Sequence, residues 1–370
     1  MAIKLLTISP SYHPRRGGIV MAVEEISRRL VERNFDCTVL TLNLRDRQPD
    51  EEFINGVRVI RVNPQFSGYL YGFSPHMYDF LKKGPEVVKQ ADIVHIHGYH
   101  NLLGMETAYL LRDKPIVFNA HYHGIASTWF NSMLLKAYKP LGGRIFSYAH
   151  KIVCVSQIEA GLLCRDFGVG TERIRVIGPG LPVLKNAGII REKINGREVR
   201  LLSVGHVRKY KGMQFILEGM RRLLDEYGMT SSLDIVGIGE YENELKRLAS
   251  RLNIQHQIAW NGIVPAAELT RKYQAADIFL LLSKAEAYGL VVAEALAAGV
   301  PSIVTRSLAL TEFTHEPGCF GIDYPPDPSE LAALIYRMCA SDIQVGPFTS
   351  GKIRDWDEVS DEYEDLYRNL

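Results

Sequence analysis

The fold is decided by Ile278-Phe-Leu-Leu-Leu-Ser-Lys-Ala-Glu-Ala-Tyr-Gly-Leu-Val-Val-Ala-Glu-Ala-Leu-Ala-Ala-Gly-Val-Pro301. Its first five residues predict a buried strand, and the alanine-rich residues after Gly289 predict a helix that begins near Leu290. A strand, a glycine turn and a helix in this order place backbone N–H groups at a helix N-terminus, where anions bind. The stretch therefore predicts an α/β protein with an anion site at the carboxyl end of a strand.

Two carboxylates flank the predicted turn, since Glu286 precedes Gly289 and Glu294 follows it within the helix. One carboxylate there could accept two hydrogen bonds from a ribose diol, while the other holds a hexose hydroxyl. The alternative is a solvated helix glutamate beside an unrelated loop glutamate. The bare spacing favours that alternative, but the preceding strand and the Tyr288-Gly289-Leu290 turn favour a sugar site.

Length and composition indicate two ordinary globular domains. The 370 residues exceed one ordinary core, because domains typically hold roughly 100–200 residues. Short apolar strands alternate with helices through both halves, which predicts two doubly wound, Rossmann-like domains with parallel sheets. We expect domains at residues 1–182 and 199–345, a linker at 183–198, and a C-terminal helix within 346–370 that crosses back to the first domain.

Charge and cysteine usage limit the partners and the compartment. The 43 basic residues nearly equal the 42 acidic ones, so the basic excess of a nucleic-acid binder is missing and we expect no nucleic-acid partner. The five cysteines form no Cys-x-x-Cys pair, no leader pattern opens the chain, and no apolar run reaches ~18 residues. We expect a cytoplasmic protein. Residues 129–140 mix aromatic, apolar and lysine side chains, so they suit either peripheral contact with the inner membrane face or a core helix.

Two further loops join a predicted strand to a predicted helix. Gly17-Gly18 would let backbone amides approach an anion, although it lacks the Gly-x-Gly-x-x-Gly fingerprint and suits a plain turn equally. The loop Val204-Gly-His-Val-Arg-Lys-Tyr-Lys-Gly212 brings cations to a strand end in the second domain. The alternative for these cations is a solvated surface.

Histidines repeat at a spacing of two, with His95 and His97 on one strand and His121 and His123 after the next. A metal site built on two such pairs would need further ligands in one eight-fold barrel series, whereas this chain predicts two separate sheets. We therefore expect no metal. The Asp355-Trp-Asp357 sequence lies in the C-terminal amphipathic segment, and we expect it to be solvated.

The spacing Ser283-x-x-Glu-x-Tyr-Gly-Leu-x-x-x-Glu-Ala-x-Ala-x-Gly-x-Pro301 resembles the signature of retaining glycosyltransferase family 4, and the resemblance extends over nearly the whole chain. It implies the GT-B fold, with two Rossmann-like domains facing across a cleft. It also implies transfer of a hexose-type sugar from a nucleotide diphosphate sugar to a hydroxyl of a glycan, glycolipid or lipid-linked saccharide, with retention and no cofactor beyond this co-substrate.

The resemblance assigns roles to individual residues. Glu286 would hold the transferred sugar and Glu294 the ribose. His121, with His123 as the neighbouring alternative, would contact the sugar from the first domain. Lys211, the helix N-terminus and the Gly17-Gly18 loop would stabilise the departing diphosphate. The predicted catalytic residues are His121, Lys211 and Glu286; the predicted substrate-binding residues are Gly17, Gly18, His97, His206, Arg208, Lys211, Tyr288, Gly289, Leu290 and Glu294.

The chain departs from the family pattern at two places near the predicted site. His206 replaces the usual Arg, and neutral His lacks that residue's permanent charge, so we hypothesise that Arg208 or Lys209 compensates. Ser307-Leu-Ala-Leu310 replaces the usual Gly-Gly, although Glu312 remains. Two rival functions stay open: another nucleotide-sugar enzyme of this architecture, such as an epimerase or phosphorylase, and a non-catalytic nucleotide-sugar binder.

Overall fold

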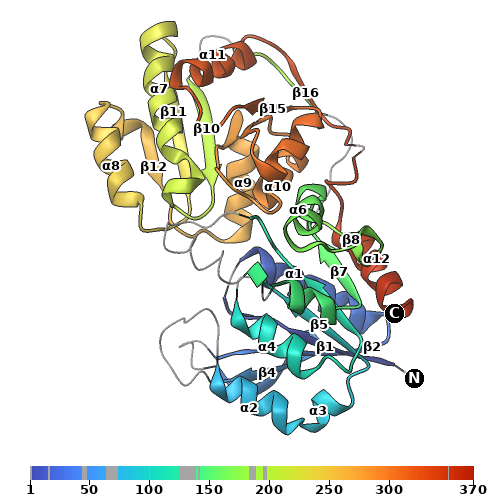
Figure 1. The fold of residues 1–370 in the computed structure, drawn as a ribbon. Helices are drawn as coiled ribbons and strands as arrows, with labels where there is room; N and C mark the ends of the chain where they lie inside the picture. The colour runs from blue at the N-terminus through green and yellow to red at the C-terminus, as the bar shows by residue number, and fades with distance from the viewer. Residues whose placement is uncertain are drawn as a thin grey trace. The chain divides into compact units, whose positions relative to one another are not determined.

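The computed structural model describes residues 2–15, 17–43, 48–63, 74–99, 101–124, 139–140, 142–182, 189–194, 198–348 and 350–370. The chain divides into two compact units (Figure 1). The first unit comprises Met1–Gly180 together with Asp355–Leu370, and the second unit comprises Leu181–Arg354.

The first unit is built on an eight-stranded sheet in the order β3-β4-β2-β1-β5-β6-β7-β8. Neighbouring strands are parallel except for the antiparallel pair β3 and β4. The strands are β1 (Ile3–Ile8), β2 (Phe35–Leu42), β3 (Glu51–Ile54), β4 (Val57–Val62), β5 (Ile93–His97), β6 (Ile116–Asn119), β7 (Lys151–Cys154) and β8 (Ile174–Val176). The helices are α1 (Gly18–Glu32), α2 (Pro75–Lys83), α3 (Glu86–Lys89), α4 (Leu102–Leu110), α6 (Gln157–Phe167) and α12 (Trp356–Arg368), with a 3-10 turn η1 (Thr171–Arg173).

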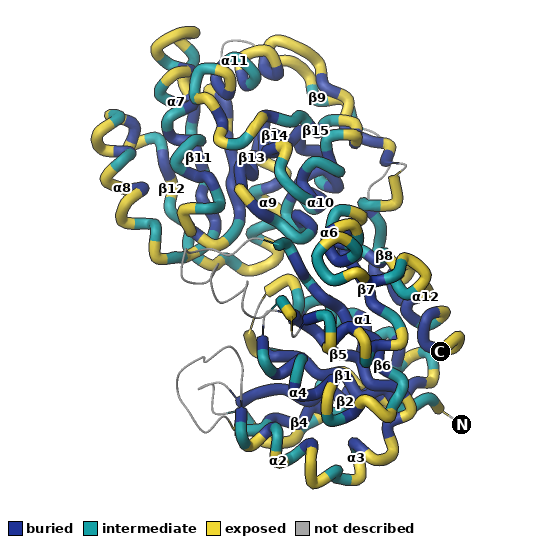
Figure 2. Tube along the Cα trace, viewed as in Figure 1, coloured by how far each residue is buried: buried dark blue, intermediate teal, exposed yellow. Residues whose placement is uncertain are grey.

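The central strands of this sheet are buried on both faces, and Figure 2 shows them as continuous dark segments. Val94 and Ile96 of β5 are fully buried, as are Val117 and Phe118 of β6. Such runs are typical of parallel strands covered by helices on both sides. Each large apolar side chain buried in this way contributes roughly 1.5–3 kcal/mol to stability.

The last helix of the chain packs in the first unit, where α12 contacts α1. Trp356 is 1% exposed and belongs to the same core as Leu30 of α1. Asp355 caps α12 by accepting hydrogen bonds from two backbone N–H groups, and Asp357 pairs with Arg29 at 2.6 Å. The expectation that this acidic sequence is solvated agrees with the structure at Asp357, whose side chain is 72% exposed, whereas Asp355 caps the start of α12.

The second unit contains a six-stranded parallel sheet in the order β12-β11-β10-β13-β14-β15 and a small antiparallel pair, β16-β9. The strands are β9 (Ile189–Arg191), β10 (Val199–Val204), β11 (Ser231–Val236), β12 (Ile258–Trp260), β13 (Ile278–Leu281), β14 (Ser302–Thr305), β15 (Cys319–Ile322) and β16 (Ile343–Val345). The helices are α7 (Met213–Tyr227), α8 (Glu242–Arg251), α9 (Ala266–Ala275), α10 (Leu290–Ala297) and α11 (Pro328–Cys339), with 3-10 turns η2 (Lys209–Lys211), η3 (Gln255–Gln257) and η4 (Leu308–His315).

The unit boundaries differ from the expected domain limits. The expected linker at 183–198 contains β9, which pairs with β16 inside the second unit. The second unit also runs past residue 345 to Arg354, so the final crossover to the first unit falls at Asp355. Residues 183–188 and 195–197 lie outside the described part of the chain.

Candidate functional site

Three loops of the second unit meet at the carboxyl ends of β10, β13 and β14, which are neighbours in the sheet. The loop after β13 donates a hydrogen bond from Lys284 N to Tyr210 O at 2.8 Å. The same loop is held from the other side, because Oγ1 of Thr305, the last residue of β14, donates to Ser283 O at 2.5 Å. Hydrogen bonds to its main chain therefore fix the loop that carries Glu286 between its two neighbours.

Lys211 and Glu286 form an ion pair at this edge, with 2.5 Å between Nζ and Oε1. Their side chains are 13% and 16% exposed, so the pair is largely shielded from water. Ser283 Oγ donates to the same carboxylate oxygen at 2.7 Å. The structure therefore brings together two of the three predicted catalytic residues.

Gly212 explains how Lys211 reaches this position. Its φ of +78° lies in the left-handed region, and a Cβ atom there would lie 2.0 Å from the carbonyl oxygen of Leu282. The chain after Lys211 thus passes directly against the end of β13. Because only glycine tolerates such an approach, the Lys-Gly pair is a local geometric requirement for the contact with Glu286.

Helix α10 begins at the predicted turn. Gly289 caps the helix with φ +111°, and Leu290 is its first residue. A Cβ atom on Gly289 would lie 2.8 Å from Leu310, so the loop after β14 packs directly on the turn. Leu308 adopts φ +47°, a left-handed conformation that costs a non-glycine residue about 1–3 kcal/mol. Leucine therefore retains, at some cost, a backbone conformation that glycine adopts readily.

Both the hydroxyl and the ring of Tyr288 contact other parts of the protein. Its side chain is buried, its hydroxyl donates to the carbonyl oxygen of Lys352, and its ring packs edge-on against Phe313 at 5.5 Å. Lys352 Nζ lies 4.9 Å from the Tyr288 ring centroid and pairs with Glu312 at 2.6 Å. The sequence predicts that Tyr288 binds substrate, but in the structure its hydroxyl is already bonded to the main chain at Lys352.

Glu294 lies four residues inside α10 and is held by Tyr273 of α9. The Tyr273 hydroxyl donates to Glu294 Oε2 at 2.7 Å. Burial raises the pKa of Glu294, and the hydrogen bond from Tyr273 opposes that effect. Sequence spacing found Glu294, but nothing in the spacing identified Tyr273 as the partner that favours its ionised form.

The other two residues predicted from this loop are exposed to solvent. His206 and Arg208 are both exposed, and Arg208 Nε lies 3.3 Å from Glu240 Oε1. Such exposed pairs contribute only about 0–1 kcal/mol, so exchanging Glu240 for another anion would cost Arg208 little. Whether Arg208 or Lys209 compensates for His206 stays a hypothesis.

In the first unit, Gly17 and Gly18 form the start of α1 after β1, with Gly17 as the cap. A Cβ atom on either residue would meet no atom within 4 Å. The extended φ of Gly17 does not require glycine either. The surrounding fold therefore leaves open space at both positions, as an approaching anion would need.

Histidines of β5 and of the segment after β6 gather in the same unit. His97 Nδ1 lies 3.3 Å from His121 Nε2, and the two rings stack at 5.6 Å between centroids. The His95 ring lies 4.2 Å from that of His97. The sequence placed these three side chains at neighbouring strand ends, and the structure brings them together.

The histidine cluster is supported from β6 and α12. His95 Nε2 lies 2.9 Å from Asn119 Oδ1, and His95 Nδ1 lies 2.7 Å from the Tyr367 hydroxyl. Asn119 Nδ2 donates to the hydroxyl of Tyr363 at 3.1 Å. Sequence reasoning missed Asn119, Tyr363 and Tyr367; the only available signal was the amphipathic spacing of the two tyrosines on the last helix.

Burial keeps these histidines neutral. It lowers the pKa of His95 and of His121 to about 4, and it lowers the pKa of His97 well below its usual value. Neutral imidazoles have one donor and one acceptor nitrogen, which suits hydrogen bonding to sugar hydroxyls. His121 adopts φ +50°, the left-handed conformation that is uncommon outside glycine.

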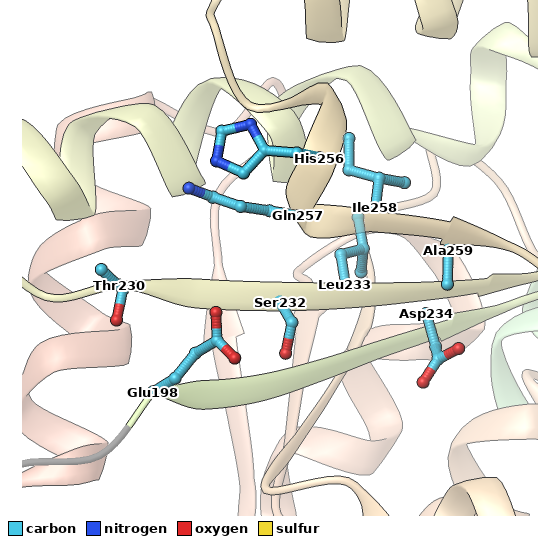
Figure 3. Close-up of a pocket in the computed structure, with 9 residues that line it drawn as sticks. All are labelled: Glu198, Thr230, Ser232, Leu233, Asp234, His256, Gln257, Ile258 and Ala259. Carbon is cyan, nitrogen blue, oxygen red and sulfur yellow. The ribbon is translucent and has the colours of Figure 1, made fainter.

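One cavity of the second unit lies apart from the predicted site residues. A cavity of about 470 Å³ opens at the amino ends of β10, β11 and β12, the edge opposite Lys211, and contains no predicted site residue (Figure 3). It is lined by Glu198, Thr230, Ser232, Leu233, Asp234, His256, Gln257, Ile258 and Ala259.

Over the described part of the chain, no three His, Cys, Asp or Glu side chains are grouped so that they could hold a metal ion.

Comparison with known proteins identifies the class. Residues 16–183 match the family model described as Glycosyltransferase Family 4, and residues 188–342 match the model described as Glycosyl transferases group 1. Sucrose-phosphate synthase from Thermosynechococcus elongatus has the same fold, with a TM-score of 0.78 at 20% identity over 99% of this chain and 98% of that one. The Anabaena protein HepE, solved with UDP and glucose, gives 0.72 at 15% identity over the full length of both chains.

Curated relatives agree with this assignment. An uncharacterized glycosyltransferase of Methanocaldococcus jannaschii is 26% identical, over 91% of this chain and 89% of that protein. Alpha-monoglucosyldiacylglycerol synthase of Streptococcus pneumoniae is 27% identical, over 92% and 79%. The chain is thus a glycosyltransferase with the GT-B fold, which confirms the predicted fold and class. It belongs to glycosyltransferase family 4, whose N-terminal and group 1 models together match most of its length.

The membrane hypothesis rests on residues 129–140, of which 129–138 lie outside the described part of the chain. Among the helices that the structure describes, none is both long enough and apolar enough to span a bilayer.

Proposed function

We propose that this protein is a retaining glycosyltransferase that moves a hexose-type sugar from a nucleotide diphosphate sugar to an acceptor hydroxyl, without a bound metal. The observation that carries the proposal is the Lys211–Glu286 pair on loops that converge beside the N-terminus of α10. A lysine and a helix N-terminus at one sheet edge supply positive charge for a departing diphosphate. The UDP and glucose bound to HepE support a donor of this class.

In this proposal the charged groups of the second unit bind the donor. Lys211 and the first N–H groups of α10 stabilise the diphosphate as the bond to the anomeric carbon breaks. Glu286 accepts hydrogen bonds from hydroxyls of the transferred sugar, and Glu294 accepts them from the ribose. In the first unit, neutral His121 contacts the sugar, and the backbone N–H groups of Gly17 and Gly18 approach the phosphates.

The acceptor is a hydroxyl of a glycan, a glycolipid or a lipid-linked saccharide. One relative is named for monoglucosyldiacylglycerol, and another, from Geodermatophilus obscurus, is a D-inositol 3-phosphate glycosyltransferase that is 26% identical over 88% of this chain. These names differ in acceptor, so an acceptor panel needs diacylglycerol, glycosylated lipids, inositol phosphate and oligosaccharides. A protein active on the lipids would act at the inner face of the membrane from the cytoplasm.

A screen of nucleotide sugars by thermal shift, followed by turnover, tests the proposal. A ligand that binds only the folded state raises the melting temperature, so the donor should stand out from nucleotide sugars with other bases. The donor is then incubated with the acceptor panel in excess chelator. We expect acceptor-dependent release of nucleoside diphosphate and a product with the donor's anomeric configuration by proton NMR. Orthophosphate dependence would indicate a phosphorylase, and an isomerised sugar an epimerase. Binding without any turnover would indicate a non-catalytic binder.

A further inference from the structure

Glu159 of α6 makes two contacts that the sequence does not explain. The side chain is buried, and its two oxygens accept from different backbone groups. Oε1 accepts from Tyr122 N at 2.5 Å, and Oε2 accepts from Val155 N at 2.6 Å. One carboxylate thus joins the start of α6 to the segment that follows β6.

These contacts differ from ordinary helix capping. Ser156 caps α6 and accepts from Glu159 N at 3.1 Å, as in a capping box. In a capping box the glutamate would return to the N–H of Ser156 itself. Here it bonds instead to the residue before the cap and to Tyr122, 37 positions earlier in the chain. Stabilisation of α6 alone does not require the second contact.

Tyr122 is held by α6 at both of its ends. Its ring is fully buried and packs on Tyr99 and Phe167, with centroids 5.2 Å and 5.1 Å away. Its hydroxyl donates to Asp166 Oδ2 at 2.7 Å. Because the backbone N–H of Tyr122 points to Glu159, the peptide group between His121 and Tyr122 has a fixed orientation.

The peptide group between His121 and Tyr122 follows a residue whose backbone conformation must be imposed by its surroundings. His121 has φ +50°, and with this backbone conformation its Nε2 lies 3.3 Å from Nδ1 of His97. Histidine adopts a left-handed conformation less readily than glycine, so the surrounding structure must impose it. The Tyr122 N–H bond to a buried carboxylate is the contact made directly on that peptide.

We propose that Glu159 is a positioning residue that holds the backbone of His121 in the conformation that directs its imidazole toward the transferred sugar. The role of His121 in this statement rests on the proposed function, whereas the hold on its backbone does not. Glu159 itself touches no substrate.

Hydrogen exchange on the wild-type protein tests the backbone part. The Tyr122 N–H should exchange as slowly as the N–H groups of β6, because it is buried and bonded to a carboxylate. In Glu159→Gln, one amide oxygen can accept from only one of the two donors, so protection at Tyr122 or at Val155 should fall while β1 stays protected. Rapid exchange of Tyr122 in the wild-type protein would overturn the proposal, whatever reaction the protein catalyses.

A double-mutant cycle tests the functional part. Glu159→Gln should lower kcat by on the order of 10- to 100-fold, as small displacements of positioned groups do, with little change in the KM of the acceptor. In a His121→Ala background the same change should add almost nothing, because both act through one imidazole. Tyr122→Phe, which keeps the N–H bond and loses the bond to Asp166, serves as the control and should retain most activity. Losses that multiply in the double variant would contradict the proposal.

Discussion

Lys211 and Glu286 lie 75 residues apart in the chain and meet at 2.5 Å between the ends of β10 and β13. The lysine reaches the glutamate because Gly212 allows the chain to pass against Leu282, and Ser283 donates to the same carboxylate oxygen. In the proposed reaction, a diphosphate that binds beside this pair would compete with Glu286 for the ammonium group. The carboxylate would then be free to accept from hydroxyl groups of the sugar.

Glu286→Gln should separate binding from turnover. Removing the carboxylate frees Lys211 and ends a like-charge repulsion, so the nucleoside diphosphate product should bind about fivefold tighter, corresponding to roughly 1 kcal/mol between unit charges in water. Transfer should become slower because a neutral amide oxygen accepts from the sugar hydroxyls more weakly than the carboxylate does. Isothermal titration calorimetry and initial rates measure the two effects, with Glu242→Gln on the surface of α8 as the control. Weaker binding of the product would count against the competition.

Tyr273→Phe should change the pH dependence of the reaction. Burial raises the pKa of Glu294, and the Tyr273 hydroxyl lowers it by bonding to the ionised form. Without that hydroxyl the pKa of Glu294 rises further. If the ionised carboxylate binds the ribose, the acid limb of kcat/KM for the donor shifts to higher pH, while the alkaline limb stays in place. An unchanged acid limb would remove Glu294 from donor binding.

Gly212→Ala should destabilise the second unit strongly. The new Cβ would lie 2.0 Å from the Leu282 carbonyl and would also occupy a left-handed conformation. Gly228→Ala is the matched control, since Gly228 has φ +63° at the end of α7 and a Cβ there meets no atom within 4 Å. The control should lose about 1–2 kcal/mol from backbone strain alone. Urea unfolding followed by tryptophan fluorescence compares them, and equal losses would refute the close approach.

The histidine cluster should make folding stability depend on pH. His121 has a pKa lowered to about 4 by burial, against about 6.5 for an unfolded chain. The unfolded state therefore binds more protons between these values, so stability is fully present above pH 6.5 and is lost as the pH falls toward 4. His121→Gln should make this loss shallower. The urea midpoint measured at several pH values gives both slopes; identical slopes would mean that His121 titrates normally in the folded protein.

Much of the fold could be predicted because its main strands are apolar runs followed by glycine turns. The strand predicted from Ile278 to Leu282 matches β13 closely, and His95 and His97 share one strand, β5, as predicted. Sequence reasoning missed short strands such as β8 and β12, since three residues are too few to show a clear period. Strand β9 was missed for a different reason. It lies in a polar stretch, and its partner β16 follows some 150 residues later, so no local pattern indicates the pairing.

The candidate site was predicted in part. Sequence order places Lys211 and Glu286 at the carboxyl edge of one sheet, but it does not reveal that they pair, because their contact depends on the turn at Gly212. Glu159 and Asn119 carry no motif that marks them as supports of a histidine cluster. Such long-range side-chain contacts follow from the packed fold, whereas strand-end positions follow from local pattern.

The role of Lys211 is tested most directly by acceptor-dependent release of nucleoside diphosphate, measured in excess chelator for the wild-type protein and Lys211→Ala. Loss of one group that stabilises the leaving charge should lower kcat by about 10²- to 10³-fold, while Lys246→Ala on the surface of α8 should retain wild-type rates. We expect this contrast while Lys211→Ala still binds the donor. Wild-type transfer that needs an added metal ion, or near-normal turnover by Lys211→Ala, would contradict it.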